Sequence, residues 1–142
     1  MSPLVRMLRR HEGVKHFAYR DHLGNVTVGV GRCLEPGVGL GLSDDEIDML
    51  LENDIARVIV ELSRCFPWFD ELNDARRDAL IDICFNLGLP GLLKFRNALA
   101  AIQAADWELA AIEFIDSRWR NQVGNRAVEL AAMIETGEYP QN

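Results

Sequence analysis

A long amphipathic segment after Ser43 constrains the fold more than any other feature of this sequence. Ser43 and Glu46 form the S-x-x-E pattern of a capping box, which satisfies free backbone groups at the start of a helix. Apolar residues then keep helical spacing for about six turns, at Ile47, Leu50, Leu51, Ile55, Val58, Ile59 and Leu62. The pattern predicts a helix over 43–65 that is long enough to connect two lobes.

The residues before this helix predict a short helix followed by a β-hairpin. Residues 2–12 begin with Ser-Pro, which suits a helix cap and first turn, and their apolar positions repeat at helical spacing up to Gly13. The helix should therefore end at Glu12. Within residues 17–31, the β-rich runs FAYRD and VTVGVG flank a turn that contains Gly and Asn, which is typical of a hairpin.

Beyond the long helix, helical patterns recur in shorter pieces. They cover residues 73–87, closed by Gly88, then 92–105, 106–117, and 125–136, closed by Gly137. We therefore predict a mostly α-helical α+β fold in one domain spanning residues 1–142. Its parts are a β-containing lobe over 13–42, the connecting helix over 43–65 and an all-helical lobe over 66–142.

Composition excludes several classes of protein. The chain is 49% apolar and 26% charged, which excludes disorder, and no apolar run approaches the ~20 residues of a membrane span. A net charge of −7 without any run of basic residues argues against a nucleic-acid partner. Three cysteines without C-x-x-C spacing argue against a disulfide framework or zinc cluster, and we expect Cys33, Cys65 and Cys84 to be small buried hydrophobes.

The first ten residues indicate where the protein is kept. Their basic side chains follow the apolar ones instead of preceding them, and no small-residue cleavage site comes next, so a secretory signal is not expected. We expect a monomer that stays in the cytoplasm until it is released.

The sequence HEGVKH at residues 11–16 has one residue too many for a zinc-binding H-E-x-x-H motif. Ligands four residues apart lie about 40° apart around a helix, whereas His11 and His16 would lie about 140° apart. Gly13 between them is also a usual helix end. We therefore expect no metal and no cofactor, and Glu12 needs another explanation.

Glu12, Asp21 and Thr27 could surround one small volume. If the hairpin closes through residues 23–25, Asp21 and Thr27 lie near each other across the strands on the same face. Glycosidic cleavage needs one carboxylic acid to protonate the leaving oxygen and one carboxylate to activate water or stabilise positive charge. The residues alone leave a plain alternative open, in which Glu12 is a solvated helix end, Asp21 a turn residue and Thr27 a strand former.

Two separated blocks of sequence bear on this choice. The run HEGVKHFAYRDHLGNVTVGVGR resembles the opening of the T-even phage lysozymes, glycoside hydrolase family 24. The stretches DARRDALIDICFNLG and DSRWRNQVGNRA resemble that family's helical lobe, in the same order. The resemblance implies a lysozyme-like fold in which the first helix packs on the helical lobe. It also implies that Trp107 and Trp119 serve packing and not sugar stacking.

The resemblance implies catalytic roles. Glu12 matches the general acid, and Asp21 matches the carboxylate that positions water or stabilises the cation-like sugar. Thr27 matches the hydroxyl that helps to hold that water. Arg126 matches an arginine that pairs with the catalytic glutamate.

The resemblance also implies substrate contacts, with some departures from the family. Phe85 and Asn86 match positions that line the cleft, although Phe85 could equally belong to the core. Ala98 and Glu113 stand where the family has Ser and Asn, and the segment after Cys33 is shorter than in the fullest members. Sugar contacts at these positions are expected to differ.

Arg32 is a further departure. It follows the hairpin where the family commonly has histidine, which forms an ion pair with aspartate. We predict that Arg32 forms an ion pair with Asp54 in the long helix.

The expected activity is hydrolysis of the β-1,4 bond between N-acetylmuramic acid and N-acetylglucosamine in bacterial peptidoglycan. The resemblance implies an endolysin that acts on the wall in the periplasm after its release. Two alternatives stay open: a non-catalytic wall-binding or structural protein on the same fold, and a lytic transglycosylase, which cleaves the same bond without water.

Overall fold

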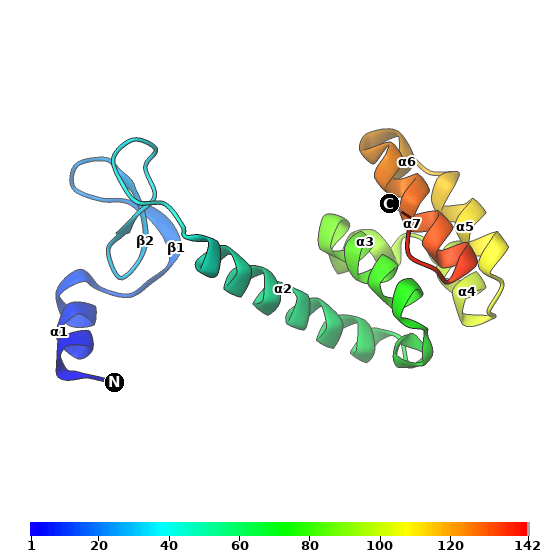
Figure 1. The fold of residues 1–142 in the computed structure, drawn as a ribbon, viewed down its shortest axis with the longest axis horizontal. Helices are drawn as coiled ribbons and strands as arrows, with labels where there is room; N and C mark the ends of the chain where they lie inside the picture. Colours follow the sequence, from blue (N-terminus) through cyan, green and yellow to red (C-terminus); the bar gives the residue numbers. More distant parts are fainter. Residues whose placement is uncertain (142) are drawn as a thin grey trace. The chain divides into compact units, whose positions relative to one another are not determined.

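The computed structural model describes residues 1–141 and divides into two compact units, Met1–Leu51 and Glu52–Asn142. The division falls inside the long helix α2 (Asp44–Cys65), so that helix contributes residues to both units. Helices dominate, and the strands form one small sheet (Figure 1). The predicted mostly helical α+β fold is confirmed.

The first unit combines a short helix with a three-stranded antiparallel sheet. Its elements are α1 (Pro3–Glu12), β1 (Lys15–Arg20), β2 (Val26–Gly29) and β3 (Arg32–Cys33), with strand order β1-β2-β3. The Ser2 hydroxyl accepts a hydrogen bond from the Val5 N–H at 3.1 Å, and Gly13 ends the helix with a φ of 80°. Both predicted ends of this helix are correct.

Two features of the sheet decide how its residues face one another. In the register of β1 and β2, Thr27 lies opposite Tyr19, so Asp21 falls on the same face, one diagonal step away. The third strand, β3, was not predicted, because two residues are too few to show a β pattern. It places Cys33 opposite Thr27 on the other side of β2.

The start of α2 has the predicted capping box. The Ser43 N–H donates to Glu46 Oε1 at 2.9 Å, and the Glu46 N–H donates to Ser43 Oγ at 3.3 Å. The helix ends at Cys65, two residues before Pro67, which agrees with the sequence pattern. Reciprocal capping thus fixes the first turn of α2.

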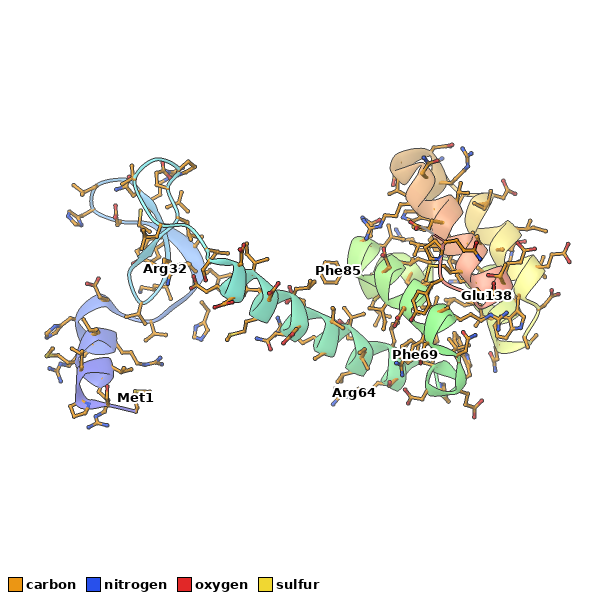
Figure 2. The ribbon with its side chains drawn as sticks, viewed as in Figure 1. Met1, Arg32, Arg64, Phe69, Phe85 and Glu138 are labelled. Carbon is orange, nitrogen blue, oxygen red and sulfur yellow. The ribbon has the colours of Figure 1, made fainter. Side chains whose placement is uncertain are left out.

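The second unit is helical and contains all the fully buried apolar side chains of residues 1–141. Its elements are η1 (Phe69–Glu71), α3 (Asp74–Leu93), α4 (Arg96–Gln103), α5 (Trp107–Ile115), α6 (Arg118–Val123) and α7 (Asn125–Thr136). Phe69 from η1 and Phe114 from α5 are both fully buried in the core, and Phe69 is labelled in Figure 2. This core is where the hydrophobic stabilisation of the chain is concentrated.

The predicted helix over 92–105 was wrong at its start. Gly88 interrupts α3 with a φ of 73°, and the chain resumes one helical turn in which Pro90 occupies an early position where its missing N–H costs nothing. Leu92 therefore belongs to this turn, and α4 begins only at Arg96. The short elements η1 and α6 were not predicted either, since neither is long enough to show a period.

Trp107 and Trp119 pack against the helical core, as expected. Trp119 is buried against Phe95 and Phe114, with ring centroids 6.1 and 6.3 Å away. Trp107 is half-buried against the core, and the Arg76 guanidinium lies 3.9 Å from its ring centroid.

The cysteines follow the prediction only in part. Cys84 is buried, and burial raises the pKa of its thiol to about 11. Cys33 is half-buried and Cys65 is exposed, so the expectation that all three are buried was wrong. Cys65 is the last residue of α2. Within residues 1–141, no helix is both long and apolar enough to cross a membrane.

Candidate active site

Glu12 is held at the point where α1 stops. The Gly13 N–H closes the helix by donating to the Arg9 carbonyl at 3.0 Å, which leaves the exposed Glu12 side chain at the last helical position. Its carboxylate lies against Gly31 in the turn after β2. A Cβ atom on Gly31 would sit 2.9 Å from Glu12 Oε2, and the φ of Gly31 is 69°. Gly31 therefore provides the space that the Glu12 carboxylate occupies.

Asp21 is fixed by the turn between β1 and β2. Its Oδ1 accepts hydrogen bonds from the N–H groups of Leu23 and Asn25, both at 2.9 Å. The Asp21 backbone N–H donates to the Asn25 carbonyl at 2.9 Å. The turn thus engages one carboxylate oxygen and leaves Oδ2 without a protein donor among residues 1–141, so Oδ2 can accept a hydrogen bond from water or sugar.

Thr27 is the only residue of Met1–Leu51 that is buried, with 3% of its surface exposed. Its hydroxyl donates to the Asn25 carbonyl at 3.0 Å, so its proton is already used. The oxygen can therefore act only as an acceptor toward a bound water. Asn25 consequently orients both Asp21 and Thr27, and sequence reasoning treated it only as a turn residue.

The two carboxylates lie near opposite ends of β2. Asp21 is bonded at the turn that enters this strand, and Glu12 lies against the turn that leaves it. The strand itself spans about 10 Å, because its four residues are separated by three steps of roughly 3.3 Å. This arrangement leaves room between the carboxylates for a sugar bond and a water molecule.

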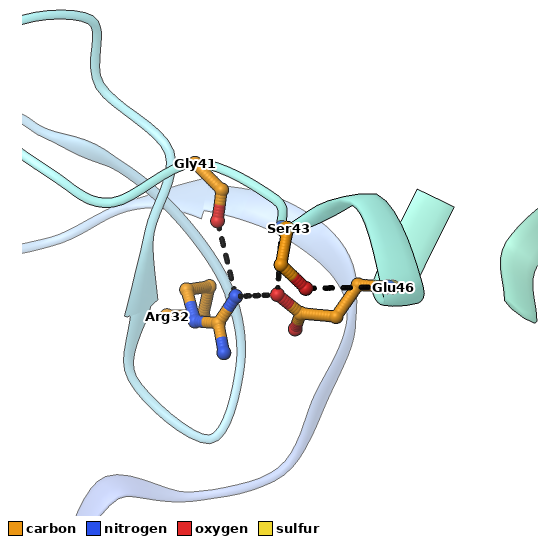
Figure 3. Close-up of polar contacts among 4 residues, drawn as sticks. All are labelled: Arg32, Gly41, Ser43 and Glu46. Atoms are coloured by element: carbon orange, nitrogen blue, oxygen red, sulfur yellow. Dashed lines mark hydrogen bonds and ion pairs between the residues drawn. The ribbon is translucent and has the colours of Figure 1, made fainter. Parts of the chain in front are cut away.

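Arg32 connects the sheet to α2, but not through the predicted partner. Its Nη1 donates to Glu46 Oε1 at 2.6 Å and to the Gly41 carbonyl at 3.0 Å (Figure 3). The prediction of an ion pair with Asp54 was wrong, because Asp54 pairs with Arg57 one turn further along. Asp54 lies eight residues after Glu46, about 12 Å along the helix, which is out of reach for a side chain already bonded to the first turn.

The capping glutamate is strongly stabilised in its charged form. The hydrogen bond from Arg32, followed by that from the Ser43 N–H, lowers the pKa of Glu46 to about 2 from its usual 4.5. The Glu46 carboxylate therefore caps α2 and also binds Arg32 of the sheet.

The shortened segment after Cys33 folds tightly on itself. Gly39 lies so close to the Cys33 carbonyl that a Cβ atom would be 2.2 Å from its oxygen. The Gly41 N–H also donates to that carbonyl, at 3.4 Å. The Cys33 carbonyl thus accepts the hydrogen bond that closes the loop. The half-buried Cys33 side chain lies on the same face of the sheet as Thr27, its partner in β2.

In the helical unit, Ala98 and Glu113 line the same cavity, and their contact with substrate stays a prediction. The cavity is open, has a volume of about 700 Å³ and lies between the start of α4 and the end of α5. Buried Ala98 and Trp119 form part of its floor, and Glu113 is half-buried in its wall. Ala98 presents no polar group here, so Glu113 provides the polar contact of this pair.

Phe85 and Asn86 are exposed residues of α3. Phe85 keeps 43% of its surface exposed and projects from the helix (Figure 2), which excludes a core role in the helical unit. Asn86 Oδ1 accepts a hydrogen bond from Trp119 Nε1 at 2.9 Å. Asn86 therefore accepts the hydrogen bond of the Trp119 indole, which forms part of the cavity floor. The amide nitrogen of Asn86 is free to donate.

Arg126 is paired within the helical unit. Its Nε and Nη2 contact Asp82 Oδ1 at 2.8 and 2.6 Å. Asp82 was not singled out from the sequence, although it is a lone charge in the otherwise apolar run LIDICF. The expected pairing of Arg126 with Glu12 stays a prediction.

The histidines of the HEGVKH stretch lie on different elements. His11 belongs to the last turn of α1 and His16 belongs to β1, so they do not share a helix face. Within residues 1–141, no three histidine, cysteine, aspartate or glutamate side chains are grouped as a metal site would require.

Comparisons with known proteins agree on one family. The family profile described as phage lysozyme matches residues 9–134. The pre-baseplate central spike protein Gp5 of Enterobacteria phage T4 is 31% identical, over 94% of this chain but 28% of the spike protein, so the chain spans less than a third of that relative. A probable T4-type lysozyme of Dictyostelium discoideum is 28% identical over 96% of both chains. An endolysin of Acyrthosiphon pisum secondary endosymbiont phage 1 is 24% identical over 91% of this chain and 86% of the endolysin.

Proposed function

This chain belongs to the phage lysozyme family, and we propose that it hydrolyses the β-1,4 bond between N-acetylmuramic acid and N-acetylglucosamine in bacterial peptidoglycan. Its function is of the lysozyme type. The observation that carries the finer proposal is the arrangement around β2, where Glu12 lies at one end and Asp21 and Thr27 at the other.

In this proposal Glu12 is the general acid. Its carboxyl protonates the glycosidic oxygen as the bond to the sugar breaks. Gly31 leaves room for this carboxylate, because a side chain at residue 31 would displace it. The pH–rate profile should have an acid limb and an alkaline limb, because Asp21 must be ionised while Glu12 is protonated.

Asp21 and Thr27 together hold the attacking water. Asp21 Oδ2 accepts one proton of the water, and the Thr27 oxygen accepts the other, because its own proton is bonded to Asn25. Because the length of β2 separates the turn that holds Asp21 from the turn that contacts Glu12, we infer that the two carboxylates stand farther apart than the roughly 5 Å of retaining glycosidases. The first product should therefore have inverted anomeric configuration, which NMR of a fresh digest measures.

Substrate contacts in the helical unit are assigned to Phe85, Asn86, Glu113 and Arg126. Exposed Phe85 offers an apolar surface, the Asn86 amide offers a donor, and Arg126 offers the guanidinium nitrogen that Asp82 does not engage. We further propose that peptidoglycan is the partner, that the protein acts as a monomer without a cofactor, and that it stays in the host cytoplasm until it is released to the periplasm.

Two other functions have to be tested directly. A non-catalytic wall-binding protein would leave the turbidity of permeabilised Gram-negative cells unchanged, whereas the proposed enzyme should clear the suspension, and a chelator should not slow it. A lytic transglycosylase would also clear the suspension but would leave a 1,6-anhydro sugar. Retention of a second carboxylate, Asp21, on a hydrogen-bonded turn favours hydrolysis, since the intramolecular route needs no group to activate water.

The sharpest test of the roles uses Asp21→Asn. Asparagine keeps an Oδ1 acceptor for the N–H groups of Leu23 and Asn25, so the turn should survive while the charge is lost. Hydrolysis should fall by at least about 10²-fold if Asp21 activates water. An unchanged rate would remove Asp21 from the mechanism.

A further inference from the structure

A small cavity lies where α2 ends and η1 begins, and it uses none of the residues assigned to catalysis or to glycan binding. The residues that line it come from the segment between these two elements and from the end of α4: Cys65, Phe66, Pro67, Trp68, Glu71 and Gln103. Its volume of about 350 Å³ falls within the roughly 300–1,000 Å³ typical of small-ligand sites. The lining contains no basic side chain and a single carboxylate. The cavity therefore combines aromatic groups with one negative charge.

The turn of η1 places the Trp68 and Glu71 side chains on one edge of the cavity. The Glu71 N–H donates to the Trp68 carbonyl at 3.1 Å, and side chains three residues apart eclipse each other in such a 3₁₀ turn. The neighbouring Asp70 accepts a hydrogen bond from the Ser63 hydroxyl at 3.0 Å. The exposed Glu71 carboxylate, by contrast, has no ion-pair partner within 4.0 Å among residues 1–141. It can therefore bind a cationic ligand.

The Trp68 indole offers one of its two faces to such a ligand. Phe66 stacks on the other face, with ring centroids 4.8 Å apart and an interplanar angle of 23°. Trp107 of the same unit already has the Arg76 guanidinium over its ring, 3.9 Å from the centroid. Within residues 1–141, no side-chain cation lies over Trp68 in the same way. Because the face of an indole attracts cations, Trp68 can bind one from solution.

We propose that this cavity binds a small organic ammonium cation, with the cation over the Trp68 indole and beside the Glu71 carboxylate. Aromatic faces are the groups that recognise quaternary ammonium ligands. Residues 61–71 carry three carboxylates and one basic side chain, so the local field also attracts a cation. The exposed Gln103 amide can form a hydrogen bond with a hydroxyl group on the ligand. The site is separate from the proposed hydrolysis and does not depend on it.

Choline is the probe, titrated into the full wild-type chain at constant ionic strength and followed by NMR of the indole N–H groups. The Trp68 signal should shift saturably, with a dissociation constant on the order of 1 mM. The signals of Trp107 and Trp119 should stay in place, because neither residue lines the cavity. The neutral alcohol in which carbon replaces the choline nitrogen has the same shape, and it should bind at least about tenfold more weakly.

Two neighbouring carboxylates give a matched pair of variants. Glu71→Gln keeps the size of the side chain and removes its charge, so choline affinity should fall about tenfold. Asp70→Asn removes a charge from the same turn, but Asp70 does not line the cavity, and asparagine can still accept the Ser63 hydrogen bond. Its choline affinity should stay within about twofold of wild type. Both variants should hydrolyse peptidoglycan as wild type does.

The outcomes decide both the site and the source of the cation. No saturable shift at Trp68, equal affinity for the neutral alcohol, or equal losses in Glu71→Gln and Asp70→Asn would overturn the proposal. If choline binds, sedimentation with phosphatidylcholine vesicles that Glu71→Gln abolishes would identify a lipid headgroup as the source. Choline binding without such sedimentation would identify a free solute. Choline binding by a chain that does not hydrolyse peptidoglycan would leave this site standing, so the two proposals fail separately.

Discussion

Thr27 is the only buried residue of the first unit, Met1–Leu51, whereas the second unit, Glu52–Asn142, contains every fully buried apolar side chain of residues 1–141. The first unit positions its side chains with glycine turns and hydrogen bonds to backbone, as at Gly31 and Asp21. The second unit does so by close packing of aromatic and aliphatic groups. The contrast implies that substitutions in the first unit should mainly change activity, and those in the second mainly stability.

The largest expected effect tests the packed core. Phe114→Ala should destabilise the protein by about 3–5 kcal/mol, because Phe114 is fully buried and contacts Phe95 at a centroid distance of 5.1 Å. Denaturant unfolding measures the change. Phe17→Ala is the control, since Phe17 is 84% exposed and its loss should stay within about 0.5 kcal/mol. Similar losses in both variants would break the contrast between the units.

The next effect concerns the proposed acid. Glu12→Gln keeps the shape of the side chain but cannot donate a proton to the leaving oxygen, so hydrolysis should fall by at least about 10²-fold. The free energy of unfolding should change by less than about 1 kcal/mol, because Glu12 is exposed. His11→Ala, one residue away, should keep activity within a few-fold. Retained lysis in Glu12→Gln would contradict the catalytic assignment.

Gly31→Ala tests whether the space beside Glu12 matters. The new Cβ would lie 2.9 Å from Glu12 Oε2, so the carboxylate must move, and activity should fall about tenfold. Gly37→Ala is matched in backbone strain, because its φ is 77° and nothing lies within 4 Å of its Cβ position. If both variants lose the same activity, backbone strain and not the position of Glu12 is responsible.

Charge distribution gives a smaller effect. Residues 1–43 carry six basic and three acidic side chains, whereas residues 44–142 carry nine basic and 19 acidic ones. Because the chain as a whole is acidic, screening should remove little long-range attraction to an anionic wall, and lysis should change less than about threefold between low and physiological salt. A steep fall would show that the basic residues of segment 1–43 govern binding despite the net charge.

The smallest effect comes from the link between the sheet and α2. The pKa of Glu46 is lowered to about 2, so the stability contributed by its contacts with Arg32 and Ser43 is fully present above pH 4.5, its usual pKa, and is lost as pH falls toward 2. Wild type should therefore exceed Glu46→Gln in melting temperature at neutral pH, and the difference should vanish near pH 2. A difference that persists at pH 2 would show that the carboxylate charge is not involved.

Much of the fold was predictable because its signals are local. Ser2 and Gly13 mark the ends of α1, and Ser43 with Glu46 marks the start of α2, in each case through bonds between residues three or four apart. The restart of the chain after Gly88 was not predictable from spacing, since it depends on a single backbone conformation.

The candidate site was predictable only where residue type alone limits the chemistry. Glu12, Asp21 and Thr27 could be proposed from sequence, and the hairpin register supports the shared face of the last two. The partner of Arg32 could not, because several carboxylates of α2 compete and only the geometry of the capping turn selects Glu46. Asp82 was missed for the same reason: its role depends on a contact with α7, 44 residues away in sequence.

Digestion of purified peptidoglycan in water enriched in heavy oxygen tests the central claim most directly. If Glu12 protonates the leaving oxygen and Asp21 activates water, mass spectrometry should find reducing N-acetylmuramic acid ends that carry one heavy oxygen atom. The Glu12→Gln variant should release such ends at least about 10²-fold more slowly. Products that end in 1,6-anhydro sugar without heavy oxygen, or no released muropeptides from the wild type, would contradict hydrolysis by this pair of carboxylates.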